Sequence, residues 1–169
     1  GVWGLGFRAQ PSKLVLLSPA GLMKPGVIKP LRAMSCMHGP IKAVLKSSQE
    51  SEWKKDFVVQ EGPCFDAMMQ AQRDQARYNA HSFDAFFQTA LYFPVFGLDD
   101  VAQRVSRLPL ATLILWGKQD RAIPLNPSLT RWEACFQGGS FKKEVWDKLA
   151  HGFYLEQPVR AAASIAEFL

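Results

Sequence analysis

Two short apolar runs, each bounded by turn-forming residues, place the strongest constraint on how this chain can fold. The first is Leu-Val-Leu-Leu at residues 14–17, between Pro11 and Pro19, and the second is Thr-Leu-Ile-Leu-Trp at 112–116, which ends at Gly117. Neither run alternates apolar with polar residues, so each is typical of a strand buried on both faces, as parallel sheets require. A short buried helix is the alternative for the first run, but proline on both sides disfavours it.

The segments around these two runs indicate crossover helices and a third strand. Residues 127–136 and 156–169 have helical spacing, residues 142–149 indicate a strand, and residues 1–10 are typical of a helix that packs closely against a sheet. The element order is therefore helix–strand, a helical insertion, then strand–helix–strand–helix. Such alternation predicts an α/β fold with a parallel sheet and right-handed crossovers.

The long segment from residue 21 to about residue 107 has no strand signal. Helical spacing occurs at residues 49–59 and again from about 64 to 91, and Asp99 with Asp100 marks another helix start. The apolar faces of these expected helices are rich in Met and Phe. Core packing accounts for most of these side chains, and a minority are expected to line a ligand cavity.

Composition and charge exclude several classes of protein. The 169 residues carry a net charge of +5, but the basic residues are scattered rather than gathered on one stripe, so no nucleic-acid partner is expected. No apolar run approaches the roughly 18–20 residues of a transmembrane segment. Cys36, Cys64 and Cys135 are widely spaced and form no metal-binding pattern. We therefore expect reduced thiols, no metal or other cofactor, and a reducing, cytoplasmic compartment.

One carboxylate and one imidazole stand where parallel sheets place their reactive groups, in loops at the carboxyl ends of strands. Asp120 follows the strand at 112–116, and His151 follows the strand at 142–149. Neighbouring strands would bring the two side chains together, and a carboxylate beside an imidazole fixes its tautomer and stabilises the imidazolium. Taken singly, Asp120 is also typical of a turn, and His151 of a hydrogen-bonded structural histidine.

Three stretches of the sequence carry a resemblance to a known family. Leu-Ile-Leu-Trp-Gly-Lys-Gln-Asp-Arg-Ala-Ile-Pro at 113–124 resembles the acid-bearing strand and turn of α/β-hydrolases, and Ala-His-Gly-Phe-Tyr-Leu-Glu-Gln-Pro at 150–158 resembles their histidine loop. Leu-Val-Leu-Leu-Ser-Pro-Ala-Gly at 14–21 is similar to the strand before the cap domain of that family. The resemblance implies the C-terminal part of an α/β-hydrolase fold, with parallel strands flanked by helices and a helical cap insertion.

The resemblance also implies a division of the chain into core and cap. Residues 1–24 and 106–169 are expected to form the core, and residues 25–105 the helical cap. The chain begins at Gly1 without Met, and residues 1–10 resemble the rest of the helix that follows the nucleophile in the family. We therefore expect a piece of a longer protein or a processed product, in need of the missing N-terminal half.

The same resemblance implies catalytic roles for the two polar residues. In the family the catalytic residues occur in the order Ser, then Asp or Glu, then His, so Asp120 is expected to orient His151 and His151 to act as the general base. Asp99 or Asp100 is the fallback acid. No Gly-x-Ser-x-Gly or Gly-x-Asp-x-Gly occurs in the sequence. The serine is therefore expected to lie outside this chain, and the chain is expected to be inactive by itself.

The activity implied for the parent protein is hydrolysis of a small, hydrophobic carboxylic ester or lipid-like substrate, by an esterase-like or lipase-like enzyme. Two alternatives remain open. An Asp nucleophile upstream would make the protein similar to epoxide hydrolases and haloalkane dehalogenases. A non-catalytic binding protein that retained the fold is the other alternative, and it would lose nothing on replacement of Asp120 or His151.

Several other polar residues are expected to have structural roles. Glu156 and Pro158 suit the N-terminus of the last helix, where an acid complements the helix dipole. Ser18 stands at the end of a strand, but its Ser-Pro sequence lacks the tight glycine-flanked turn that exposes a nucleophile. His38 and His81 lie in the helical insertion, where surface or cavity-lining positions are expected.

Overall fold

A parallel sheet of three strands organises the chain. Strands β1 (Lys13–Leu17), β2 (Ala111–Gly117) and β3 (Phe141–Trp146) lie in the order β1-β2-β3. The computed structural model describes residues 11–24, 26, 38–94, 96–136 and 140–169. All three expected strands are thus present, although the third, expected at 142–149, already ends at Trp146. The expected helix at residues 1–10 lies outside the described residues.

Strand β2 is buried on both faces, which explains its continuous apolar sequence. Leu113 and Leu115 point to one side of the sheet and Ile114 and Trp116 to the other, because successive side chains of a strand alternate. All four are 0% exposed. Each face of β2 therefore supports its own hydrophobic core.

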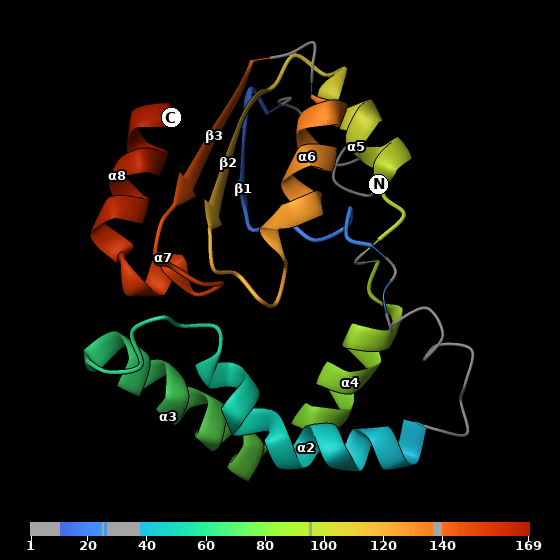
Figure 1. Ribbon diagram of the computed structural model, residues 1–169, viewed down its shortest axis with the longest axis vertical. Helices are drawn as coiled ribbons and strands as arrows, with labels where there is room; N and C mark the ends of the chain where they lie inside the picture. Colours follow the sequence, from blue (N-terminus) through green and yellow to red (C-terminus); the bar gives the residue numbers. More distant parts are fainter. Residues whose placement is uncertain (1–10, 25, 27–37, 95, 137–139) are drawn as a thin grey trace.

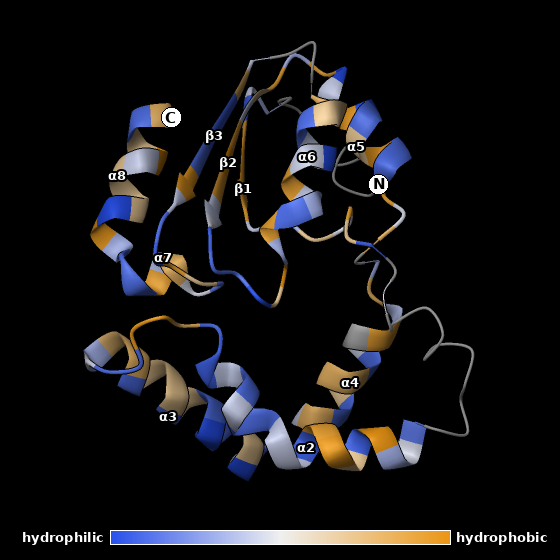
Figure 2. Cartoon of the chain, viewed as in Figure 1, coloured by the Kyte–Doolittle hydropathy of each residue, from blue (hydrophilic) through white to orange (hydrophobic). Residues whose placement is uncertain are grey.

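The two outer strands are buried less completely than β2. Val15 and Leu16 of β1 are half-buried, and Leu17 is exposed, since β1 pairs only with β2 among the described residues. The expectation that the first run is buried on both faces is therefore met only in part. Strand β3 is hydrophilic over Lys142, Lys143 and Glu144 (Figure 2), and both lysines are exposed.

Helices cover both faces of the sheet, as Figure 1 shows. Helices α5 (Asp99–Ser106) and α6 (Leu125–Cys135) lie on one face, and the short α7 (Phe153–Glu156) with α8 (Pro158–Phe168) lies on the other. On the α6 side, Trp132 and Phe136 pack against Ile114 and Trp116. The parallel strands and the helices on both sides make an α/β fold.

Among the described residues of the insertion are helices that lie beyond the carboxyl ends of the strands (Figure 1). They are α2 (His38–Lys54), α3 (Pro63–Tyr78) and α4 (Ser82–Tyr92). Phe83, Phe87 and Leu91 of α4 form a small core with Ile41 of α2. No strand occurs among the described residues of this segment, as its sequence predicts.

The boundaries of both helical stretches predicted in this insertion are wrong. The helix expected at 49–59 begins at His38 and ends at Lys54, and the run expected from 64 to 91 is interrupted at residues 79–81. At the interruption, Asn79 has an extended backbone (φ −120°, ψ 94°), and its side-chain oxygen accepts the N–H of His81 at 3.1 Å. Asparagine competes with helical hydrogen bonds in this way, whereas apolar spacing continues across the break.

Gly117 allows a very close approach between the loops that follow β2 and β3. A Cβ atom at this position would lie 2.7 Å from the carbonyl oxygen of Leu149 and closer still to that of Ala150. Because both obstacles are backbone atoms, a side chain could be accommodated only if the two loops moved apart.

Replacing Gly117 with Ala is expected to destabilise the fold by about 1–3 kcal/mol, the usual cost of overpacking a tight site. Chemical denaturation measures this change. Gly39→Ala is the matched control, because a Cβ atom at Gly39 meets nothing within 4 Å and alanine favours a helix. Equal stability of the Gly117→Ala and Gly39→Ala variants would contradict the close approach.

Candidate active site

Asp120 is held by a tight turn at the carboxyl end of β2. Its backbone N–H donates to the carbonyl of Gly117 at 3.2 Å, and its Oδ1 accepts the backbone N–H of Ile123 at 2.7 Å. The indole N–H of Trp116 donates to the carbonyl of Ile123 at 3.1 Å, which ties the far end of the turn to the sheet. The carboxylate is fully buried and its orientation is therefore set before any ligand arrives.

His151 lies in the loop between β3 and α7, which is bonded to the Asp120 turn. The backbone N–H of Lys118 donates to the carbonyl of Trp146 at 3.0 Å, and that of Gln119 donates to the carbonyl of Leu149 at 2.8 Å. Because β2 and β3 are adjacent parallel strands, both loops emerge at the same edge of the sheet.

The two side chains meet at this edge. Nδ1 of His151 lies 2.8 Å from Oδ2 of Asp120, and the imidazole is 31% exposed. An ionised carboxylate only accepts hydrogen bonds, so Nδ1 carries the proton and Nε2 is left as a base in the neutral ring. Nε2 forms no hydrogen bond with a described residue.

The surroundings of His151 act on its pKa in opposite directions. Burial lowers the pKa, whereas the hydrogen bond and negative charge of Asp120, together with the charge of Asp56, raise it. The net effect is a pKa above the ordinary value of 6.5. Asp120 therefore stabilises an imidazolium at this position, as a general base requires when it takes up a proton.

Glu156 connects the histidine loop to the helical insertion, a role that the sequence did not indicate. Its Oε2 accepts the backbone N–H groups of Val58 and Val59 at 2.9 and 2.8 Å, and its Oε1 accepts that of Ala150 at 3.3 Å. The expectation that Glu156 serves the last helix is therefore wrong, although Pro158 does begin α8. Local sequence favours an acid before this helix, but the two bonds to Val58 and Val59 are made by residues 98 and 97 positions away.

A second contact reinforces this connection. The backbone N–H of Gly152 donates to the carbonyl of Asp56 at 2.6 Å. A Cβ atom at Gly152 would lie 2.9 Å from that oxygen and 3.0 Å from Cζ of Phe57, so glycine is needed for the close approach. The loop after α2 therefore lies directly against the histidine loop.

The other polar candidates do not join Asp120 and His151. Asp99 forms an ion pair with Arg131. Ser18 is buried at the end of β1 with φ of 39°, and its hydroxyl has no hydrogen-bond partner among the described residues. His38 makes an edge contact with the ring of Phe87, and His81 is exposed at the start of α4.

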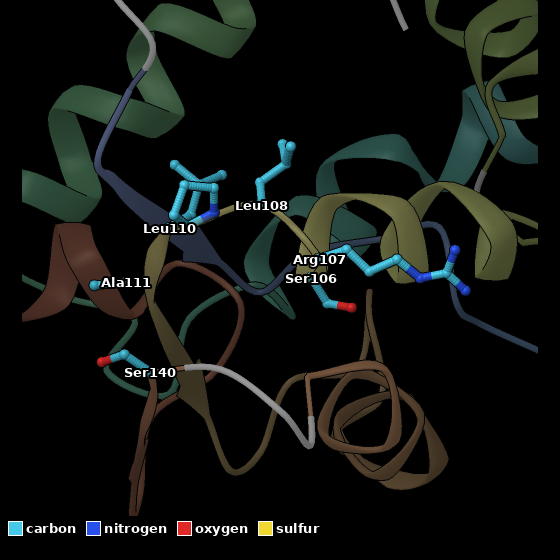
Figure 3. A pocket seen from close by; sticks show the side chains of 7 residues that line it. Ser106, Arg107, Leu108, Leu110, Ala111 and Ser140 are labelled. Carbon is cyan, nitrogen blue, oxygen red and sulfur yellow. The ribbon is translucent and has the colours of Figure 1, made fainter.

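One cavity lies at the end of the sheet opposite His151. It has a volume of about 620 Å³ and is formed around the amino ends of β2 and β3, as Figure 3 shows. Its lining residues are Ser106, Arg107, Leu108, Pro109, Leu110, Ala111 and Ser140. This cavity is therefore separate from the Asp120–His151 pair.

The described residues lack two further kinds of functional element. They contain no group of three or more His, Cys, Asp or Glu side chains that could hold a metal ion. None of their helices combines the length and apolarity that a bilayer crossing requires.

Similar proteins are found by fold and not by sequence: no family model and no curated protein matches this chain. An esterase (EaEST) from Exiguobacterium antarcticum superposes with a TM-score of 0.68 and 16% identity, over 97% of this chain and 59% of the esterase. MGS-M2, an α/β hydrolase enzyme from a Medee basin deep-sea metagenome library, superposes with a TM-score of 0.60 and 11% identity, over 93% of this chain and 55% of that enzyme.

The chain thus spans less than three fifths of the length of either similar structure. Both superpositions extend over nearly all of this chain, and both neighbours are hydrolases. Together with the parallel sheet and its flanking helices, they show that the chain has an α/β-hydrolase-like fold.

Replacing Asp120 with Asn is expected to lower the pKa of His151, because the charge that raises it is removed while burial remains. In the wild-type protein the folded-state pKa lies above the unfolded value. The protonated imidazole therefore adds stability below about pH 6.5, and this contribution is lost as the pH rises through the folded-state pKa. NMR titration of the imidazole measures the pKa, with Asp147→Asn as an exposed control. An unchanged pKa in Asp120→Asn would contradict the pairing.

Replacing Glu156 with Ala is expected to release the loop after α2. The amide protons of Val58 and Val59 should then exchange with solvent about tenfold faster, because they lose a charged acceptor. Hydrogen–deuterium exchange measures this rate, and Glu167→Ala, an exposed acid on α8, is the control. Equal exchange in both variants would show that Glu156 does not hold the loop.

Proposed function

We propose that this chain supplies the acid and the base of a Ser-Asp-His triad in a hydrolase that acts on carboxylic esters or lipid-like esters. The single observation that carries the proposal is the 2.8 Å hydrogen bond between His151 Nδ1 and Asp120 Oδ2, at the carboxyl ends of adjacent strands. The α/β-hydrolase-like fold supports it, since this fold places an acid and a histidine in these loops. The esterase among the similar structures supports an ester as substrate.

In the proposed reaction His151 moves protons and Asp120 stabilises the charge. Nε2 of His151 takes the proton of a serine hydroxyl while the serine oxygen attacks the ester carbonyl carbon, and it then passes that proton to the departing alcohol. In the second half, Nε2 takes a proton from water as the water oxygen attacks the acyl-serine. The serine oxygen leaves with the proton, so that ester and water become acid and alcohol.

The proposed serine lies outside these 169 residues. Two observations support this part: no Gly-x-Ser-x-Gly occurs in the sequence, and the chain spans 59% and 55% of the two similar structures. We place the segment that carries the serine along the outer side of β1, because β1 pairs only with β2 among the described residues. Unpaired strand edges with half-buried apolar residues favour addition of another strand.

Replacement of His151 or Asp120 in the product of the full reading frame tests the proposal. Hydrolysis of p-nitrophenyl esters of short and long acids is measured, and His151→Ala and Asp120→Asn are each expected to lower kcat by roughly 10³–10⁴-fold, as for other triads. His81→Ala and Asp147→Asn replace exposed side chains that form no hydrogen bond with Asp120 or His151, so they serve as matched controls and should keep full activity.

Three outcomes would contradict the proposal. Unchanged hydrolysis in both variants would favour a binding protein that retains the fold. Activity on epoxides or haloalkanes, with no labelling by a serine-directed phosphonate, would indicate an Asp nucleophile. Stoichiometric phosphonate labelling of the 169-residue chain alone would place the nucleophile within it.

A further inference from the structure

A second cavity lies between the helices of the insertion. Its volume is about 290 Å³, and it is formed by residues of α2, α3 and α4 and by the turn after α2. The residues that line it are Gln49, Trp53, Asp56, Gln72, Gln75, Ala76, Ser82 and Phe86. The lining is more polar than the Met-rich and Phe-rich surface that the sequence predicts, because the methionines of α3 do not take part.

Asp56 links this cavity to the candidate active site. Its backbone carbonyl accepts the N–H of Gly152, the residue after His151, at 2.6 Å. Its carboxylate is close enough to His151 and Asp120 for their charges to act on its pKa. A molecule that occupied the cavity at Asp56 would therefore extend toward the imidazole.

The carboxylate of Asp56 is half-buried and has no hydrogen bond or ion pair with any described residue. Three acids of α2 and α4 are paired, Glu50 with Arg73, Glu52 with Lys55 and Asp84 with Lys42, whereas Asp66 of α3 has no ion pair with a described residue but is exposed. Burial raises the pKa of Asp56, so a negative charge at this position is costly without a partner. A cation bound in the cavity would remove that cost.

The rest of the lining suits an organic cation. Trp53 and Phe86 present aromatic rings, which attract cations through their π faces. The side chains of Gln49, Gln72, Gln75 and Ser82 form no hydrogen bond with a described residue, so their oxygens are available to accept N–H groups. A metal ion would need several ionised ligands, and Asp56 is the single charged side chain among the residues that line the cavity.

We propose that this cavity binds an ammonium group of the substrate, with Asp56 as the counter-ion, and so selects esters that carry an amine. The inference rests on the proposed function, because it takes the ester bond to lie at His151. Asp56 touches substrate in this arrangement but takes no part in proton transfer. The loop itself is held by the backbone carbonyl of Asp56, so replacement of the side chain alone should leave the loop in place.

Binding of benzylamine to the product of the full reading frame, the protein also used for the hydrolysis assay, tests this inference separately from hydrolysis. Isothermal titration calorimetry compares benzylamine, which is protonated at neutral pH, with benzyl alcohol, which has the same shape and no charge. Asp56→Asn is expected to weaken benzylamine binding by about tenfold and to leave benzyl alcohol unaffected. Asp66→Asn on α3 removes an exposed carboxylate and is the matched control, with unchanged binding expected.

A second variant keeps the inference testable if Asp56→Asn does not fold. Ala76→Trp keeps the charge of Asp56 but fills the cavity, and it should also weaken benzylamine binding by about tenfold. His151→Ala should abolish ester hydrolysis and retain benzylamine binding, which separates a failure of this inference from a failure of the proposed triad. Equal affinity for benzylamine and benzyl alcohol, or unchanged benzylamine binding in both Asp56→Asn and Ala76→Trp, would overturn the inference.

Discussion

The close contact between the loops after β2 and β3 is the constraint on which the candidate site depends. Gly117 has no side chain, so its backbone approaches the carbonyl groups of Leu149 and Ala150 more closely than any other residue would permit. The backbone bonds between the two loops then bring Asp120 within 2.8 Å of His151. A local packing requirement at one glycine therefore places two residues that are 31 positions apart.

Two carboxylates near His151 have different surroundings, and this difference suggests different roles. Asp120 is fully buried and both of its oxygens accept hydrogen bonds, so its energy of desolvation is offset within the protein. Asp56 is half-buried and has no partner among the described residues. The surroundings of Asp120 suit a residue that orients His151 permanently, whereas those of Asp56 suit a residue that binds a positively charged ligand. Glu156 maintains the geometry between them by joining the helical insertion to the histidine loop.

Agreement between sequence and structure is best where one local property decides the outcome. The run at 112–116 became a buried central strand because no polar residue interrupts it. Asp99 begins a helix as expected, since an acid suits a helix N-terminus. The break near residue 79 was missed, because hydrophobic spacing continues through a turn that the hydrogen bond of Asn79 stabilises. The end of α2 at Lys54 was missed as well. The role of Glu156 was missed for a related reason, since its partners at Val58 and Val59 are distant in sequence.

The parallel α/β architecture and the positions of Asp120 and His151 after successive strands follow from residues that are close together in the chain. These are local properties, namely the burial of an apolar run and the position of the polar turn that follows it, so they can be predicted from the sequence. Three features are decided only by the tertiary structure: the contact of the loop after α2 with Gly152, the bonds of Glu156 to that loop, and the lack of a partner for the carboxylate of Asp56 among the described residues. These contacts join segments about 100 residues apart, and no short sequence pattern specifies which distant groups will meet.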